Sequence, residues 1–142
     1  MQKELGNVFF HLMRELLQDH TALWQKSLPE LTKQQYAVLC AVEAEPGIEQ
    51  LDLTEAALST KATLAELLVR MEKKNLIERQ QGTTDRRRRF IFLTTEGKRV
   101  LLEARPIAEQ VDTFFLSRLG EQQQNEVVVL LKSMLAKGES GR

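Results

Sequence analysis

Thr84–Thr94, TDRRRRFIFLT, places four consecutive arginines directly before a short apolar run. From Lys61 to Arg99 the chain carries eleven Lys and Arg against five Asp and Glu, a net charge of +6. The rest of the chain holds nine bases and fifteen acids, so the formal net charge of the whole is zero. Cations concentrated in one segment indicate a polyanionic partner, because only the face that meets phosphates needs them. The alternative is a solvated charge run with no partner.

The composition is that of one ordinary globular domain. A length of 142 residues and a hydrophobic content of 42% are enough for a single core. The start of the chain lacks the apolar run of a signal peptide, and no apolar run is long enough to span a membrane. Cys40 is the single cysteine, which excludes an intramolecular disulfide. We therefore expect a cytoplasmic protein without membrane contact.

The first half of the chain has helical periodicity. Apolar residues recur at steps of three and four over about 5–26, which predicts one long amphipathic helix. Thr32 followed by Gln35 matches a capping box and predicts a second helix, which Pro46 ends.

A tight pair of helices and a hairpin are predicted next. Short helices over about 49–57 and 61–74 are separated only by Leu58-Ser59-Thr60, which lacks the glycine often found in such turns. After residue 75 the apolar period changes to two, and a polar loop containing Gly82 and the arginines separates two strand-like runs. The prediction is a helix-turn-helix followed by a β-hairpin with a cationic loop.

Two further helices are predicted at the carboxyl end. Thr94 or Thr95 caps the first, which runs to about residue 119 and contains Pro106, where we expect a kink or a division. The second covers about 121–137, and the polar tail 137–142 is expected to fray.

This order of elements predicts a mainly α fold with a small β-hairpin wing (α+β), a winged helix-turn-helix. We expect one domain over 1–142, with a DNA-binding lobe over 31–95. The helices of 1–28 and 96–137 carry more apolar surface than that lobe can cover, so they are expected to pair with a second copy in a homodimer. Two recognition helices related by a two-fold axis predict a palindromic site on double-stranded DNA.

Three segments resemble the MarR family of bacterial transcription regulators: Leu31–Leu39, Leu64–Arg79, and Asp85-Arg86-Arg87 with the later Leu93–Lys98. The resemblance spans about 30–100 in motif and the whole chain in layout. It implies a homodimeric winged-helix repressor, released from DNA by a small aromatic acid or phenol, and within the family the chain looks most like regulators of hydroxylated aromatic acids.

Two positions depart from the family pattern. Asn75 stands where the family usually has a glycine at the end of the recognition helix, and asparagine is the next best residue for a left-handed cap. Glu66 stands on the recognition helix where many members carry a polar or basic residue. Its carboxylate either accepts a hydrogen bond from a cytosine amine or points away from DNA.

Candidate DNA contacts lie on the recognition helix and the wing. Thr60, Lys61 and Thr63 open the helix, where they either meet base edges and phosphates or only cap it. Arg70 either meets phosphate or pairs with Glu66. The wing candidates are Asp85, Arg86, Arg87 and Arg88. The resemblance implies that Arg87 enters the minor groove and that Asp85 orients it, and Arg86 and Arg88 are assigned to phosphates.

A candidate ligand site combines an imidazole, an indole and a phenol. His20 and Trp24 lie one turn apart on the first helix, and Tyr36 opens the next. They would stack on an aromatic carboxylate or phenol, with charge added by Arg14 or His11, or they would simply pack at a dimer interface.

Catalysis finds no support in the sequence. No histidine, cysteine and carboxylate residues stand at metal-ligand spacing, and no phosphate-cradling loop is present, so we expect neither an enzyme nor a cofactor or metal. Cys40 is read as a buried structural thiol in preference to a redox sensor. The alternative function is a winged-helix protein-interaction module without sequence-specific DNA binding.

Overall fold

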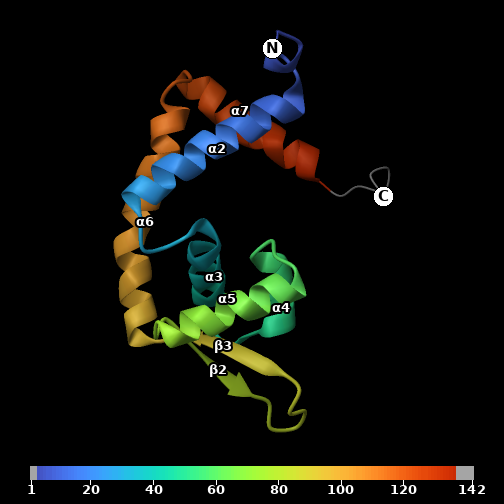
Figure 1. Cartoon of the computed structure of the whole chain (residues 1–142), viewed down its shortest axis with the longest axis vertical. Coiled ribbons are helices and arrows are strands. Elements are labelled where there is room, and N and C mark those ends of the chain that lie inside the picture. The colour runs from blue at the N-terminus through green and yellow to red at the C-terminus, as the bar shows by residue number, and fades with distance from the viewer. Residues whose placement is uncertain (1–2, 137–142) are drawn as a thin grey trace.

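The computed structural model describes residues 3–136 and consists of helices and one small sheet, which lies at one end of the molecule (Figure 1). The elements in chain order are α1 Lys3–Gly6, α2 Phe9–Ser27, α3 Lys33–Ala44, β1 Ile48–Glu49, α4 Gln50–Ala56, α5 Lys61–Lys73, β2 Ile77–Gln81, β3 Arg89–Leu93, α6 Thr95–Leu116 and α7 Glu121–Leu135. The predicted winged helix-turn-helix fold is confirmed.

The helix-turn-helix is capped as its sequence predicts. Thr32 and Gln35 form the reciprocal capping box at the start of α3. Thr60 caps α5, its hydroxyl accepting from the amide of Thr63 at 3.2 Å. In the turn between α4 and α5, Leu58 adopts the left-handed region at φ 54°, where glycine would be the unstrained choice.

The wing is part of a three-stranded antiparallel sheet in the order β1-β3-β2. The β2–β3 hairpin runs from Ile77 opposite Leu93 to Gln81 opposite Arg89. The sequence pattern did not predict β1, whose two residues pair with β3, because so short a strand has no periodicity of its own. Asn75 lies at φ 62°, as expected for a left-handed cap between α5 and β2.

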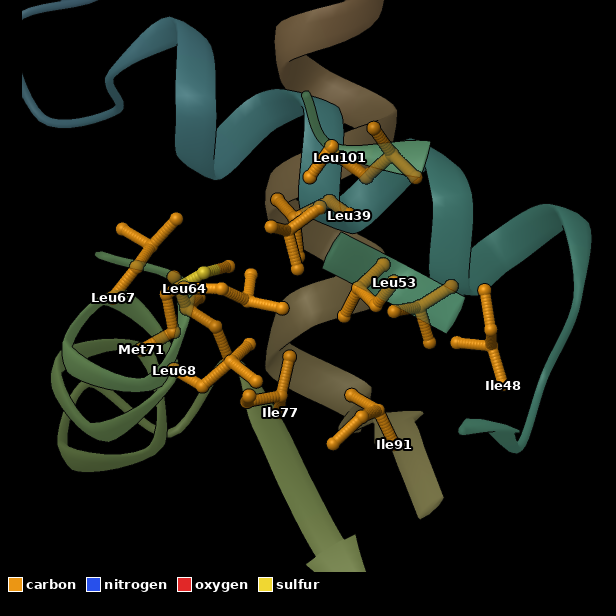
Figure 2. Packing of buried hydrophobic residues seen from close by; sticks show 14 of the residues in the cluster. Leu39, Ile48, Leu53, Leu64, Leu67, Leu68, Met71, Ile77, Ile91 and Leu101 are labelled. Atoms are coloured by element: carbon orange, nitrogen blue, oxygen red, sulfur yellow. The ribbon is translucent and has the colours of Figure 1, made fainter. Parts of the chain in front are cut away.

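The core of the lobe lies between α5 and the elements around it (Figure 2). The buried face of α5 meets side chains of α3, α4 and α6 and of the sheet. The largest fully buried side chains of the whole core include Leu39, Leu53, Leu64, Leu68, Met71, Ile77, Ile91 and Leu101. Because α5 commits its apolar face to this core, its polar face is left to solvent.

The flanking helices differ from the prediction at their ends. The predicted helix over 5–26 is interrupted: α1 ends at Gly6, and α2 begins only at Phe9, after Val8 in extended backbone. Glycine is a poor helix former, which favours a break there. α6 is capped by Thr94 and continues through Pro106 undivided, with Pro106 on its exposed side, where water can satisfy the carbonyl that loses its partner.

α7 begins as predicted and ends at Leu135, while the prediction for the tail 137–142 falls outside the described residues. α2 and α7 lie at the end of the molecule away from the wing (Figure 1). Within residues 3–136, no helix combines the length and the apolar character that a membrane span requires.

Candidate nucleic-acid interface and aromatic cluster

The exposed face of α5 carries the candidate helix contacts. Thr63, Glu66 and Arg70 are all exposed and recur at i, i+3 and i+7, so they lie along one face. Lys61 is exposed in the first turn. The sequence offers two roles for Arg70, a phosphate contact or an ion pair with Glu66. Within residues 3–136 no ion pair joins Arg70 to Glu66, so the second role is not seen in the structure. The Glu66 carboxylate lies among the candidate contacts, on the same exposed face.

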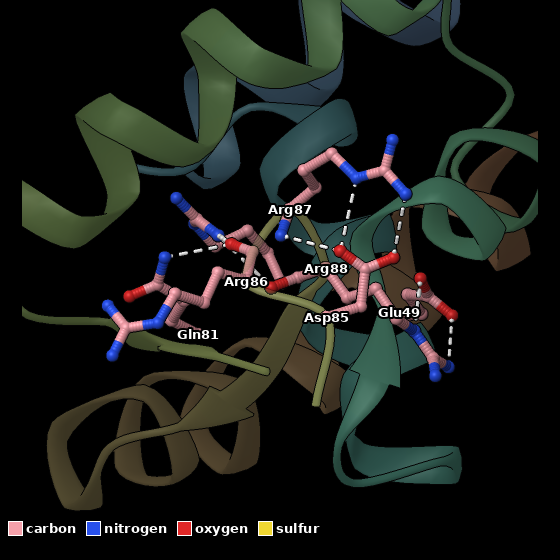
Figure 3. A network of polar contacts seen from close by, with 7 residues as sticks. Glu49, Gln81, Asp85, Arg86, Arg87 and Arg88 are labelled. Atoms are coloured by element: carbon pink, nitrogen blue, oxygen red, sulfur yellow. Dashed lines mark hydrogen bonds and ion pairs between the residues drawn. The ribbon is translucent and has the colours of Figure 1, made fainter. Parts of the chain in front are cut away.

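In the wing, Asp85 orients Arg87 (Figure 3). One carboxylate oxygen accepts from the Arg87 amide at 3.0 Å and from Nε at 3.1 Å, and the other accepts from a terminal guanidinium nitrogen at 3.1 Å. The Arg87 side chain is still 90% exposed. These bonds from Arg87, the side-chain ones first, hold the pKa of Asp85 below its ordinary value. The guanidinium is thus both held in place and open to solvent.

Arg88 is engaged differently. Its Nε and a terminal nitrogen donate to the two carboxylate oxygens of Glu49 at 3.0 and 2.8 Å, and its guanidinium lies 5.0 Å from the centre of the Phe90 ring. The hydrogen bonds from Arg88 lower the pKa of Glu49. The assignment of Arg88 to phosphate stays a prediction from the sequence; in the structure Arg88 pairs with the carboxylate of Glu49, the last residue of β1.

The two remaining wing arginines, Arg86 and Arg89, take part in hydrogen bonds inside the wing. The Arg86 carbonyl accepts from Gln81 Nε2 at 2.8 Å and from an Arg89 guanidinium nitrogen at 2.6 Å. The Arg86 side chain is exposed and, within the described part of the chain, makes no ion pair. Its charge therefore remains open to a polyanion.

The wing and α5 enclose a cleft of about 670 Å³ together with the start of α4. Lys61 lines it from α5, and Arg87 and Arg88 line it from the wing, with Gln50 and Thr54 from α4. Cations from two elements thus face one space, together with the Asp85 and Glu49 carboxylates that pair with Arg87 and Arg88. Cations placed in this way suit contact with a phosphate backbone.

The aromatic cluster lies where α2, α3 and α6 meet. The rings of His20 and Trp24 are 6.4 Å apart, those of Trp24 and Tyr36 5.3 Å, and those of His20 and Phe115 5.4 Å. Trp24 Nε1 donates to the Leu31 carbonyl at 2.8 Å. The three predicted residues are therefore brought together, and they pack on one another.

Polar groups surround this cluster. His20 Nε2 lies 2.8 Å from an Asp112 carboxylate oxygen, while the buried Nδ1 atom has no partner among the described residues. Burial is the main cause that raises the pKa of the Tyr36 phenol; the Cys40 thiol adds to it and the Arg105 guanidinium opposes it. Cys40 itself is half-buried and packs against the core.

Arg14 and His11 are not part of the cluster. They line a separate hollow of about 760 Å³ along α2, together with residues such as Gln18 and Thr21. His11 stands nine residues before His20, which is about two and a half turns of the helix, so the two imidazoles point to opposite sides.

Sequence reasoning missed Glu49, Asp112 and Phe115. Each lies far along the chain from the group that it meets: Glu49 is 39 residues from Arg88, and Asp112 is 92 residues from His20. No local spacing could have identified either pair.

Comparison with known proteins identifies relatives of the whole chain. The sequence model of the MarR family matches residues 31–88. The transcriptional regulator HosA of Escherichia coli O157:H7 is 52% identical over 131 residues, which cover 92% of this chain and 97% of HosA. The HTH-type transcriptional repressor NicR of Pseudomonas putida is 28% identical over 132 residues, covering 92% of this chain and 84% of NicR. The solved structure of Bordetella bronchiseptica BpsR, a protein whose DNA binding is regulated by 6-hydroxynicotinic acid, is similar with a TM-score of 0.88 at 27% identity and covers 94% of this chain and 96% of that one.

Proposed function

Because the chain belongs to the MarR family of transcription regulators, we propose that it is a homodimeric repressor that binds a palindromic operator and is released by a small aromatic acid or phenol. A regulator of this kind acts where the chromosome lies, in the bacterial cytoplasm. Repression has support in the name of NicR, and the effector class has support in the 6-hydroxynicotinic acid that regulates BpsR.

The main structural support for DNA binding is that Lys61 of α5 and Arg87 of the wing line the same cleft. In a winged helix, the recognition helix, here α5, enters the major groove, and the wing reaches the neighbouring minor groove. We assign Thr60, Lys61, Thr63 and Arg70 to the helix contacts, and Arg86 and Arg87 to the wing contacts, with Asp85 holding Arg87 in place.

Dimerisation has support in the apolar side chains that α2 and α7 leave uncovered. No residue of α7 is buried, although it carries large apolar side chains that are 42–75% exposed, from Val128 to Leu135. On α2, Phe9, Phe10 and Leu17 are more than half exposed. Exposure of so much apolar surface to water is energetically unfavourable, and a second copy would cover it with the same surface through a two-fold axis.

The aromatic cluster is the proposed effector site. Trp24 and Tyr36 supply ring faces, and the unpartnered Nδ1 of His20 supplies a hydrogen-bonding atom that a ligand carboxyl or hydroxyl would satisfy. Release from DNA requires that the effector bind one spacing of the two recognition helices better than another.

The first test is fluorescence anisotropy with DNA from upstream of the protein's own gene and with a scrambled duplex, at several salt concentrations. Arg87→Ala should weaken operator binding by about 1–3 kcal/mol. Arg99→Ala is the matched control, because it removes the same charge from α6, where Glu96 and Glu103 hold Arg99. Equal effects of the two variants would remove the wing contact from the proposal, and equal affinity of the wild type for both duplexes would favour a protein-interaction module.

The effector is tested with 4-hydroxybenzoate and 6-hydroxynicotinic acid. Trp24 is the single tryptophan, so its fluorescence reports binding at the cluster directly. We expect a saturable change that His20→Gln weakens and Arg14→Ala leaves unaltered. The opposite pattern would move the site to the hollow along α2 that Arg14 lines.

A further inference from the structure

The wing carries two arginine–carboxylate pairs of different reach (Figure 3). Asp85 and Arg87 are two residues apart, so their pair stays inside the loop. Glu49 and Arg88 are 39 residues apart, and their pair joins the loop to β1. Both carboxylate oxygens of Glu49 are used, at 3.0 and 2.8 Å, which is the bidentate geometry that fixes orientation as well as distance.

Glu49 ties this pair to the recognition helix through a short path. It is the last residue of β1 and directly precedes Gln50, the first residue of α4. α4 in turn packs on α5 through a common core that contains Leu53 and Leu64, both fully buried. The Glu49 carboxylate is thus connected to the helix that presents Lys61 by the continuous chain from β1 to α4 and by the packed side chains between α4 and α5.

The loop itself, residues 82–88, has few other constraints. Its backbone is held by the bond from the Gly82 amide to the Arg88 carbonyl at 2.9 Å and by the bond from the Arg88 amide to the Asp85 carbonyl at 3.1 Å. β1 adds only two residue pairs to the sheet beside it. The Arg86 carbonyl also accepts from Gln81 and Arg89, which belong to the two strands of the hairpin. All of these bonds lie within the hairpin, so none of them sets its position relative to α4 and α5.

We propose that Glu49 and Arg88 are positioning residues, whose bidentate pair sets the width of the cleft between the wing and α5 so that Arg87 and Lys61 reach adjacent grooves of one duplex. This inference rests on the proposed DNA-binding function and deepens it. Arg88 then acts through Arg87 and does not itself bind phosphate.

Charge supports this assignment. If Arg88 turned to a phosphate, it would leave the Glu49 carboxylate, whose side chain is only 24% exposed, without its partner at the edge of a polyanion. Desolvation and repulsion would both oppose that exchange. Arg87, with its side chain 90% exposed, meets no such obstacle.

Glu49→Gln separates the two roles of Arg88, because they predict opposite signs. If Arg88 binds phosphate, the substitution removes a competing carboxylate, and operator and scrambled duplex are both bound more tightly. If the pair positions the wing, operator affinity falls by about tenfold, the loss of a single groove contact, while scrambled DNA is bound as before or more tightly. The ratio of the two affinities is the decisive readout.

Asp52→Asn is the matched control, since Asp52 lies on the exposed side of α4 near Arg88 and makes no ion pair among the described residues. It should leave the affinity ratio unchanged. Arg88→Lys is the second variant, since it keeps the positive charge and loses the bidentate fork. Positioning predicts a fall in the ratio for Arg88→Lys as well, whereas a phosphate contact predicts a ratio near that of the wild type.

Thermal unfolding of each variant shows whether it is folded, and a misfolded Glu49→Gln leaves the decision to Arg88→Lys. A wild type that prefers no operator would refute the proposed function itself. A selective wild type whose ratio survives both Glu49→Gln and Arg88→Lys would refute only the positioning pair.

Discussion

Gly97→Ala should destabilise the protein, although alanine is the better helix former. Gly97 is buried in the first turn of α6, where its amide donates to the Thr94 hydroxyl at 2.9 Å. A Cβ atom at Gly97 would lie 2.0 Å from the Leu76 carbonyl oxygen. That oxygen already accepts from the Thr94 amide at 3.1 Å, so α6 and the start of the wing meet backbone to backbone here.

The magnitude follows from three contributions. Weak carbon–oxygen contacts are about 3.3 Å or longer, so the backbones must separate by more than about 1 Å. Such overpacking costs about 1–3 kcal/mol, and weakening the bond from Thr94 to Leu76 costs about 0.5–1.5 kcal/mol more. Higher helix propensity returns at most about 1 kcal/mol. The expected net loss is about 2 kcal/mol in the free energy of unfolding.

Urea unfolding followed by Trp24 fluorescence measures this loss. All samples are compared at one protein concentration, because the stability of the proposed homodimer would depend on concentration. Gly6→Ala is the control, since a Cβ atom there meets nothing within 4 Å, and its effect should stay within about 0.5 kcal/mol. If Gly97→Ala were as stable as the wild type or gained about 1 kcal/mol, helix propensity alone would decide this position, and the close approach of α6 to Leu76 would be refuted.

Three other substitutions or titrations probe further contacts. Leu58→Gly should raise the free energy of unfolding by about 0.5–1 kcal/mol, because Leu58 is 93% exposed at φ 54° and glycine relieves the left-handed strain at a smaller entropic cost; a less stable variant in urea would show that the Leu58 side chain contributes contacts. Tyr36 is the only tyrosine, so the absorbance change at alkaline pH reports its ionisation alone, and the midpoint should lie above 10.0. The stability that this raised pKa contributes is complete below pH 10 and is lost as the pH rises through the pKa of the folded state. A midpoint at or below 10.0 would contradict the burial of the phenol. Trp24→Phe leaves the Leu31 carbonyl without its donor and should cost about 1–3 kcal/mol, measured by circular dichroism; a cost under about 0.5 kcal/mol would mean that water replaces the indole.

Local features of the sequence predicted most of the fold. Thr32, Thr60 and Thr94 were identified as helix starts, with Thr95 as an alternative to Thr94, and the structure shows each of the three capping the helix that follows. Asn75 was identified as a left-handed cap, and its φ of 62° agrees. These signals are reliable because a cap satisfies backbone groups within three residues, so its cause and effect lie in the same short segment.

The candidate sites were predicted less completely. The arginine run could be recognised because its members are neighbours in the chain, and the Asp85–Arg87 pair is what the resemblance to the MarR family implies. Arg14 and His11 were grouped with His20 by their common helix, yet the structure places them along a different hollow, because a helix turns 100° per residue and only some of its side chains share a face.

By itself, the amino-acid sequence determined the order of helices and strands, their caps, the cationic wing and the apolar faces of the flanking helices, since each depends on periodicity and on contacts between near neighbours. Only the tertiary structure decided that Arg88 meets Glu49, that His20 meets Asp112, and that the two-residue strand β1 completes the sheet. These contacts join segments 39 or more residues apart, and they form only after the buried core has brought α3, α4, α5 and α6 together, so no local pattern in the sequence encodes them.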